Sequence, residues 1–254
     1  MQRAQCTFVI VLTTLSPLNA FWWSTRVSAV GALVTVEGLD GAGKRTLSTA
    51  LSAQLQAGGA RVATMAFPRY GRSVHADLVS EALHGRLGDL GESVHGMATL
   101  FALDRADAAA ELRAKLAEHD VVLLDRYAAS NAAFGAARLH QDADGEFVSW
   151  VRELEFGRLS IPVPTLQVLL RVPVELAAAR AVQREATDAN RSRDAFERDG
   201  QLQQRTGAVY EQLAQNGWVS AWYVHAPAGD SSIGGERAAV QQLVERLQHG
   251  PHSP

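Results

Sequence analysis

The sequence predicts an α/β fold of three layers, in which a parallel five-stranded sheet is flanked by helices. Two observations carry this prediction. Short apolar runs alternate along the chain with longer stretches of helical periodicity, and strands joined through such long helical segments require parallel crossovers. The 254 residues also contain no internal repeat and no linker long enough to divide the chain, so we expect a single domain.

Composition excludes several classes of protein. Hydrophobic residues make up 47% of the chain and charged residues 20%, which is typical of a soluble globular domain and not of a disordered chain or a coiled coil. The net charge is -3, whereas binding to nucleic acid through bulk charge needs a basic excess, so we expect no nucleic-acid partner. The single cysteine, Cys6, excludes a disulfide framework and cysteine-based zinc sites and favours a reducing compartment.

Five apolar runs are expected as the strands, and they cover residues 32–36, 61–67, 121–124, 166–172 and 221–224. The spacing of apolar residues between them predicts helices. Leu47, Leu51 and Leu55 recur at i, i+4 and i+8, which places them on one face of the first helix. Further helices are expected at about 74–84, 92–118, 129–138 and 144–159, from 174 onward, and at about 199–216 and 235–247.

Both ends of the chain are expected to lie outside the fold. Arg3, the apolar run 8–12 and the small residues near position 20 imitate the parts of a signal peptide. Residues 13–17 break the apolar run, which is too short to span a bilayer, so we expect no membrane segment. The favoured interpretation of residues 1–30 is an extension ahead of a domain that begins near Val30, and export is the alternative. The tail 248–254 is expected to be disordered.

The segment 38–46, Gly-Leu-Asp-Gly-Ala-Gly-Lys-Arg-Thr, lies between the first strand and the first helix. Its glycines let the backbone wrap so that N–H groups point at phosphate oxygens, and the helix start adds a positive dipole. Lys44 is one of only two lysines beside 22 arginines; we expect it in an exposed loop, as a cation for the β and γ phosphates. The usual Ser or Thr does not follow it directly, because Arg45 precedes Thr46. The segment predicts a P-loop NTPase-type fold, and a flexible turn with a chance lysine is the alternative.

Two weaker signals agree with a phosphate loop. The third strand ends in Asp125, which resembles the metal-holding carboxylate of a Walker B element, although strands also end in Asp for reasons of turn formation. Five arginines fall within the stretch 180–198. Alone they would indicate a solvated basic surface, and beside a phosphate loop they predict a lid that clamps the transferred phosphoryl group. These five are Arg180, Arg184, Arg191, Arg193 and Arg198.

A further group of residues indicates what receives the phosphate. Residues 67–71 follow the second strand at its carboxyl end, where open α/β sheets bind ligands. Phe101, Asp104 and Arg105 lie at i, i+3 and i+4, so one helix face offers a ring that can stack a base and a guanidinium that can donate to a base carbonyl. The spacing alone leaves a core phenylalanine beside a surface ion pair equally open. Arg126 follows Asp125 and suits an acceptor phosphate.

These motifs together resemble the thymidylate kinase family. The resemblance covers residues 31–247 and is carried by the segments 36–46, 67–71, 101–105, 125–127 and 130–131, while the run 202–210 resembles the actinobacterial branch. It implies a fold of the nucleoside monophosphate kinase type with a lid at about 180–198. It also implies direct in-line phosphoryl transfer from ATP to dTMP, giving dTDP for dTTP synthesis, with Mg²⁺ as cofactor, in a cytoplasmic homodimer.

The resemblance further implies a role for each motif residue. Residues that would hold the ATP phosphates are Gly38, Leu39, Asp40, Gly41, Ala42, Gly43, Lys44, Arg45 and Thr46. Residues that would contact dTMP are Asp40, Phe67, Arg69, Phe101, Arg105, Arg126, Asn131 and Phe134, with Phe101 stacked on thymine, Arg105 and Asn131 on the base, and Arg69 and Arg126 on the phosphate. The catalytic residues would be Lys44, Asp40, Arg126, Arg184 and Arg193. Metal-binding carboxylates would be Asp40, Asp125 and Glu197, with Asp194 nearby and Arg191 also in the lid.

The sequence departs from the family pattern in places. Residues 1–30 have no family counterpart, and Phe134 and Phe196 stand where close relatives tend to carry tyrosines. Phe134 is still expected to form a wall that excludes a 2′-hydroxyl from the acceptor's sugar. A kinase for another nucleoside monophosphate is the nearest alternative function, and a P-loop switch or regulatory ATPase is the second. A GTPase would need an Asn-Lys-x-Asp motif, which neither lysine of this chain provides.

Overall fold

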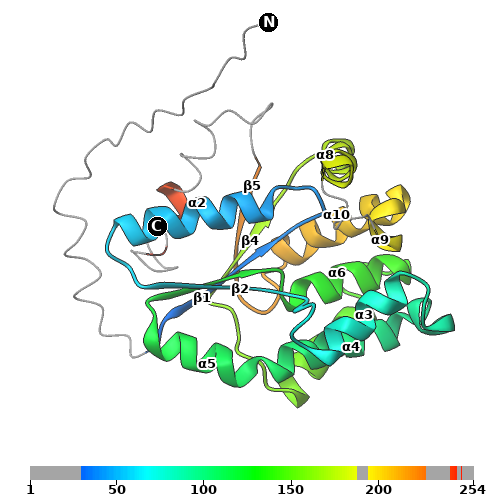
Figure 1. Ribbon diagram of the computed structural model, residues 1–254, viewed down its shortest axis with the longest axis horizontal. Coiled ribbons are helices and arrows are strands. Elements are labelled where there is room, and N and C mark those ends of the chain that lie inside the picture. The colour runs from blue at the N-terminus through cyan, green and yellow to red at the C-terminus, as the bar shows by residue number, and fades with distance from the viewer. Residues whose placement is uncertain (1–29, 188–193, 227–240, 245–246, 248–254) are drawn as a thin grey trace, which may run out of the picture.

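The computed structural model describes residues 30–187, 194–226, 241–244 and 247 (Figure 1). Five parallel strands form one sheet in the order β2-β3-β1-β4-β5, which confirms the predicted α/β class. The strands are β1 (Ala32–Glu37), β2 (Val62–Ala66), β3 (Val121–Asp125), β4 (Leu166–Leu170) and β5 (Ala221–His225). Each begins within one residue of the start of an expected apolar run. The strands β1, β3 and β4 are buried along nearly their whole length, and strands buried on both faces are apolar throughout.

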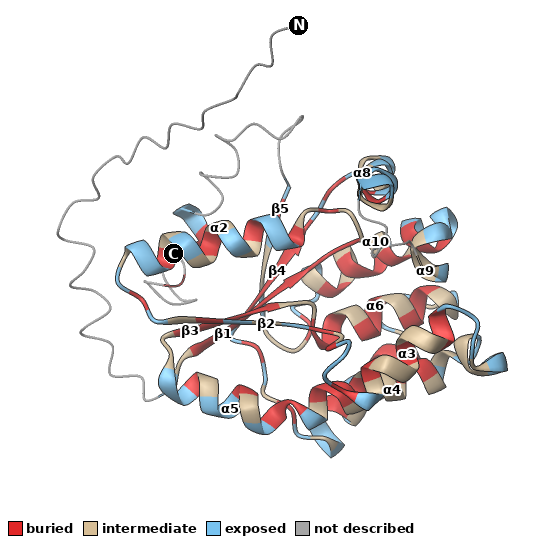
Figure 2. Ribbon diagram, in the orientation of Figure 1, coloured by how far each residue is buried: buried red, intermediate tan, exposed pale blue. Residues whose placement is uncertain are grey.

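Helices cover both faces of the sheet and make three layers. On one face, α2 (Lys44–Ala57) buries Leu47, Leu51 and Leu55 against β1 residues such as Val34 and Val36. On the other face, Leu33 of β1 joins a core formed mainly with α4, α5, α6, α7 and α10. These helices span Val94–Asp107, Ala109–Glu118, Ala128–Arg138, Glu146–Arg152 and Gly200–Gln215. The two cores follow from the alternation of side chains along a strand, and Figure 2 shows the buried sheet between the helical layers.

The remaining elements surround one edge of the sheet. A separate small core joins α3 (Val74–Leu83) to α4, and a 3-10 turn η1 (Gly88–Gly91) connects these helices. The helices α8 (Val174–Thr187) and α9 (Ala195–Arg198) lie on either side of residues 188–193, which are outside the described part of the chain. No helix among the described residues is long and apolar enough to cross a membrane.

Two expected helices differ from the structure. The expected helix 92–118 is two helices, α4 and α5, which meet at Ala108. No glycine or proline marks that junction, so the apolar spacing continues through it and the sequence carries no signal for the break. The expected helix 144–159 consists of α7 followed by a π-helical turn, η2 (Glu153–Arg158).

The expected ends of the domain are only partly described. Of the expected helix 235–247, residues 241–244 are helical, and Leu243 and Leu247 are buried in the core beside α2. The segments 1–29 and 248–254 lie outside the described residues.

Candidate functional site

A cavity of about 1260 Å³ lies at the carboxyl ends of the parallel strands. One end is lined by residues of the loop 40–46, and the other by side chains of α3, α4 and α6, with α8 and α9 at the rim. Pockets for one drug-sized ligand commonly have volumes of roughly 300–1,000 Å³. This cavity is therefore larger than a site for one such ligand needs to be.

The loop before α2 requires glycine at specific positions. Gly38, Gly41 and Gly43 have φ angles of 139°, 79° and 103°, which L side chains rarely adopt. A Cβ on Gly38 would lie 2.7 Å from the carbonyl oxygen of Leu170, and one on Gly41 would lie 2.0 Å from that of Ala177. The loop is thus held in a compact shape against β4 and α8, with α2 beginning directly after it.

Lys44 is buried, and the expectation that it lies in an exposed loop was wrong. It is the first residue of α2, its side chain folds back over the loop, and its Nζ donates to the carbonyl oxygens of Gly38 at 3.1 Å and Leu39 at 2.9 Å. Burial, with a contribution from the positive charge of Arg126, lowers the pKa of Lys44 from 10.5 to about 8. Tertiary packing against the strand ends causes this burial, and local spacing carries no information about it.

The loop residues do not all face the cavity. Asp40, Gly41, Gly43, Lys44, Arg45 and Thr46 line it. Gly38 and Leu39 line a smaller cavity of about 210 Å³ on the other side of the loop, together with residues of β4 and α10. Ala42 is buried, and its carbonyl oxygen accepts a hydrogen bond of 3.4 Å from Arg180.

Two carboxylates near the loop could hold a divalent cation through oxygen. Asp125 lines the cavity, and its Oδ1 is buried without a hydrogen-bond partner among the described residues, as expected of a group whose partner is a ligand. Asp40 lies in an ion pair with Arg126. Burial raises the pKa of Asp40, but the charges of Arg126 and Lys44 outweigh burial and lower it overall, so this group is ionised. The described residues contain no cluster of three or more His, Cys, Asp or Glu fit to hold a metal alone, and Mg²⁺ commonly needs only one or two carboxylates besides phosphates and water.

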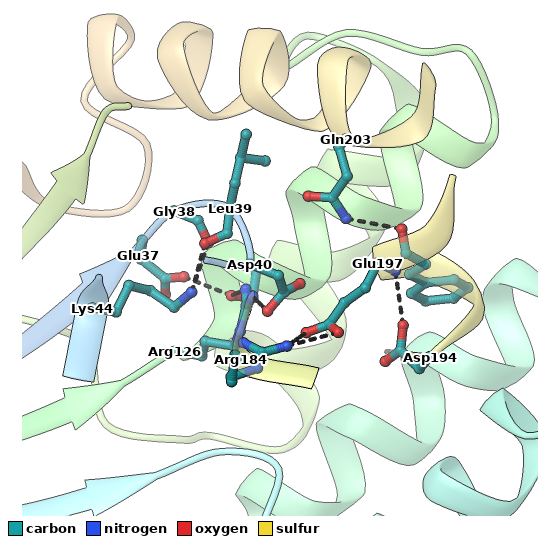
Figure 3. A network of polar contacts seen from close by, with 12 residues as sticks. Glu37, Gly38, Leu39, Asp40, Lys44, Arg126, Arg184, Asp194, Glu197 and Gln203 are labelled. Carbon is teal, nitrogen blue, oxygen red and sulfur yellow. Dashed lines mark hydrogen bonds and ion pairs between the residues drawn. The ribbon is translucent and has the colours of Figure 1, made fainter. Parts of the chain in front are cut away.

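Arg126 stands between the two ends of the cavity. It follows β3, has a φ of 65°, and its backbone N–H donates to the carbonyl oxygen of Val36. Its Nη2 donates to Asp40 at 2.5 Å, and its Nη1 donates to Ser130 at 3.1 Å and to Tyr210 at 3.4 Å (Figure 3 shows the Asp40 side of this network). Burial opposes its charge, but Asp40 outweighs burial and raises the pKa of Arg126, so the guanidinium stays charged.

The far end of the cavity is built mainly by α4 and α6. Phe101 and Arg105 of α4 line it together with Phe67, Asn131 and Phe134. Arg105 is buried and held by Glu155 through two hydrogen bonds of 2.6 Å, and Asn131 donates to the same carboxylate at 2.8 Å. The ion pair of Arg105 is therefore buried and not a surface pair. The ring of Phe101, the guanidinium of Arg105 and the amide of Asn131 therefore line the same end of the cavity.

Phe134 faces the cavity beside charged and aromatic neighbours. Its ring lies 5.3 Å from the Cζ of Arg126, is stacked on Phe196 at 6.1 Å, and meets Tyr210 edge-on at 6.4 Å. It is thus a pocket wall and not only a core residue.

Arg69 lies outside the cavity lining. Its Nε donates to Asp104 at 2.8 Å and its Nη2 to Asp107 at 2.5 Å, and its backbone N–H donates to Asp104 as well. In this arrangement the guanidinium fastens the segment after β2 to α4. The expected contact with the acceptor phosphate is not prearranged in this structure, because Arg69 does not line the cavity.

Within the stretch 180–198, which was expected to form the lid, one ion pair between described residues lies at the rim of the cavity. Arg184 of α8 donates to both carboxylate oxygens of Glu197 in α9, at 2.6 and 2.8 Å (Figure 3). Asp194 caps α9 by accepting the backbone N–H of Glu197. Burial raises the pKa of Asp194, and burial together with Asp40 raises that of Glu197. Arg191 and Arg193 lie outside the described residues.

Three residues around the site had no assigned role in the sequence analysis. Glu37, which ends β1, and Tyr210 of α10 share a buried hydrogen bond of 3.2 Å. Glu155 lies beneath Arg105. Two of the three carry a signal, since Glu37 is a charge at the end of a mainly apolar strand, and Glu155 falls on the apolar helix face with Phe147 and Val151.

The chain is similar to known proteins over this same region. A family model described as thymidylate kinase matches residues 36–229. A thymidylate kinase of Mycobacterium tuberculosis (strain ATCC 25618 / H37Rv) is 56% identical over 192 residues, which cover 76% of this chain and 90% of that protein. A thymidylate kinase of Homo sapiens is 31% identical over 59% of this chain and 65% of its own. One of Xanthomonas euvesicatoria pv. vesicatoria (strain 85-10) is 37% identical over 59% of this chain and 60% of its own.

Proposed function

The chain belongs to the thymidylate kinase family, in agreement with the resemblance seen in its motifs, and on that premise we propose how its cavity phosphorylates dTMP with ATP. One observation carries the proposal. A single cavity has the glycine loop with Lys44 at one end, and Phe101, Arg105 and Asn131 at the other, with Arg126 between them. This arrangement supports a donor phosphate site and an acceptor site in the same cavity, with the cation Arg126 between them.

Different residues of the cavity serve the donor phosphates and the acceptor phosphate during in-line transfer. An acceptor phosphate oxygen of dTMP attacks the γ-phosphorus of ATP, the bond from that phosphorus to the β,γ-bridging oxygen breaks, and ADP leaves with the electron pair. No protein nucleophile is needed, because positioning and charge neutralisation supply most of the catalysis in phosphoryl transfer. Lys44 and Arg184 neutralise the donor phosphates, Arg126 fixes the acceptor phosphate, and Asp40 orients Arg126.

The acceptor end supplies selectivity for the base and the sugar. Phe101 stacks on thymine, and Arg105 and Asn131, both held by Glu155, contact the base. Phe134 walls the sugar and offers a 2′-hydroxyl no hydrogen-bond partner, so a ribonucleotide would lose the hydration of that group without compensation.

We also propose that Mg²⁺ takes part, with Asp125 as the protein's main contribution to its shell. The buried, unpartnered Oδ1 of Asp125 supports this assignment, because Mg²⁺ prefers oxygen ligands. When bound, Mg²⁺ would neutralise charge on the phosphates. Asp40 and Glu197 are already paired with Arg126 and Arg184, and are the secondary candidates. The family resemblance further supports a homodimer located in the cytoplasm. Sedimentation of the purified protein would test whether it is a dimer.

Replacing Arg126 tests the assignment of the acceptor site. We expect Arg126→Ala to raise the KM for dTMP on the order of 10- to 100-fold while changing that for ATP far less, since a hydrogen-bonded charge contact is worth about 1.5–3 kcal/mol. Arg61→Ala is a matched control, because Arg61 pairs with Asp120 at the surface and should leave both KM values unchanged. Equal effects of Arg126→Ala on both substrates would show that Arg126 has only a structural role.

A further inference from the structure

Glu37 is a fully buried carboxylate that accepts hydrogen bonds from three separate groups. Its Oε1 accepts the backbone N–H of Tyr127 at 2.8 Å. Its Oε2 accepts the hydroxyl of Ser130 at 2.7 Å and that of Tyr210 at 3.2 Å. Glu37 does not line the cavity, so a role in the reaction has to pass through these partners.

The two hydroxyls connect Glu37 to Arg126. Ser130 and Tyr210 lie 2.8 Å from each other, and both accept from Nη1 of Arg126. A guanidinium has only donors. Burial raises the pKa of Glu37, but its three hydrogen bonds all come from groups that donate to it, so Glu37 acts as the acceptor for both hydroxyls. Each hydroxyl has one proton, and both protons are therefore directed away from Arg126 toward Glu37, either directly or through the other hydroxyl. This order leaves a lone pair on each hydroxyl for Arg126.

The same network fixes the plane of the guanidinium. The hydroxyls hold Nη1, Asp40 holds Nη2, and the ring of Phe134 lies 5.3 Å from Cζ. A guanidinium held in advance binds phosphate with less loss of entropy than a free one.

We propose that Glu37 is a positioning residue for the acceptor phosphate, because it sets the hydrogen-bond direction of Ser130 and Tyr210 and thereby holds Arg126 in place. The proposal rests on the proposed role of Arg126 at that phosphate. Glu37 touches neither substrate and forms or breaks no bond in the reaction.

Glu37→Gln tests this direction of hydrogen bonding with little change in shape. The N–H of Tyr127 can only donate, so the glutamine carbonyl oxygen must face it and the NH₂ group must face Ser130 and Tyr210. At least one hydroxyl then turns its proton toward Arg126 and disturbs the guanidinium. We expect the dissociation constant for dTMP to rise about tenfold, as for an unsatisfied buried polar group. Those for ATP and for thymidine, which lacks the phosphate, should change less than about twofold.

Tyr127→Phe is the matched control. It also removes a buried polar contact, the hydrogen bond of 3.0 Å from the Tyr127 hydroxyl to the carbonyl oxygen of Pro162, and it leaves the backbone donor to Glu37 in place. It should lower stability without changing the affinity for dTMP. If Glu37→Gln does not fold, Tyr210→Phe takes its place, because it removes one acceptor of Arg126 and keeps Glu37. Tyr210→Phe should raise the dissociation constant for dTMP severalfold and leave that for thymidine unchanged.

A double-mutant cycle separates the proposal from its premise. Glu37→Gln should have no further effect on dTMP binding in an Arg126→Ala background, and an additive loss would overturn the proposal. If Arg126→Ala weakens dTMP no more than thymidine, the premise about Arg126 is wrong. Arg126→Ala could instead weaken the binding of dTMP and not that of thymidine, while Glu37→Gln and Tyr210→Phe both bind dTMP as the wild type does. In that case the role of Arg126 stands and only the positioning role of Glu37 is wrong.

Discussion

At the scale of single residues, the site depends on charges that are buried before any substrate is bound. Lys44 and Arg126 are both enclosed near the strand ends. The partners of Lys44 are two carbonyl oxygens, and those of Arg126 are a carboxylate and two hydroxyls. Such preorganised charges are effective in phosphoryl transfer, since they need little reorganisation when charge develops on the phosphate. The two cations respond differently to burial. The pKa of Lys44 falls to about 8, whereas a guanidinium keeps its charge throughout.

The lowered pKa of Lys44 predicts a pH dependence of ATP binding. With a pKa of about 8 in the free protein, Lys44 is charged at pH 7.5 and largely neutral at pH 9, and only the charged form attracts the phosphates. We expect the dissociation constant for ATP to rise about eightfold between these pH values. Titration calorimetry at constant ionic strength would measure it. Lys44→Met should bind ATP weakly with no comparable rise, and an equal rise in this variant would assign the effect to another group.

At the scale of elements, the glycine loop works because it packs against β4 and α8. Gly41 lies against the backbone of Ala177 in α8, whereas a Cβ on Gly43 would find its nearest atom, in Leu170, at 3.8 Å. The loop is therefore closely packed at Gly41, on its α8 side, and open at Gly43. The contact at Gly41 connects the glycine loop to the helix that carries Arg184.

A pair of glycine substitutions tests that packing. Gly41→Ala and Gly43→Ala both place a side chain at positive φ, which costs about 1–2 kcal/mol, but only the first adds a clash with backbone. We expect Gly41→Ala to lower the free energy of unfolding by about 1–3 kcal/mol more than Gly43→Ala does. Urea denaturation followed by circular dichroism would measure both. If both substitutions lower the free energy of unfolding equally, α8 moves away from the new side chain at position 41 without an energetic cost.

At the scale of the whole molecule, the parallel sheet brings the carboxyl ends of its strands to the same end of the sheet. The registers pair Val36 with Asp125 in β3 and with Val168 in β4, so the strands that carry Glu37 and Asp125 end side by side. The N–H of Gly31, the residue before β1, donates to the carbonyl oxygen of Leu116 and so connects the start of the sheet to α5.

We therefore expect a chain that begins at Val30 to fold and to keep its activity. Its kcat and both KM values should lie within about twofold of those of the full chain, and its unfolding midpoint should change little, because it retains every described strand. Coupled assays and thermal denaturation of the two forms would compare them. Loss of activity or of soluble protein on removing residues 1–29 would show that this segment belongs to the domain.

The sequence by itself determined the layers of the fold and the glycine loop before α2. Both are local signals, since a buried strand shows as a run of apolar residues, as at 121–124 in β3, and one buried helix face as the spacing of Leu47, Leu51 and Leu55. Only the tertiary structure decided the partners of the charges. Arg69 meets Asp104, 35 residues away, Arg105 meets Glu155, 50 residues away, and Glu37 meets Tyr210, 173 residues away. Such pairs depend on how whole helices pack against the sheet, and the same packing buries Lys44, so no local spacing could have revealed them.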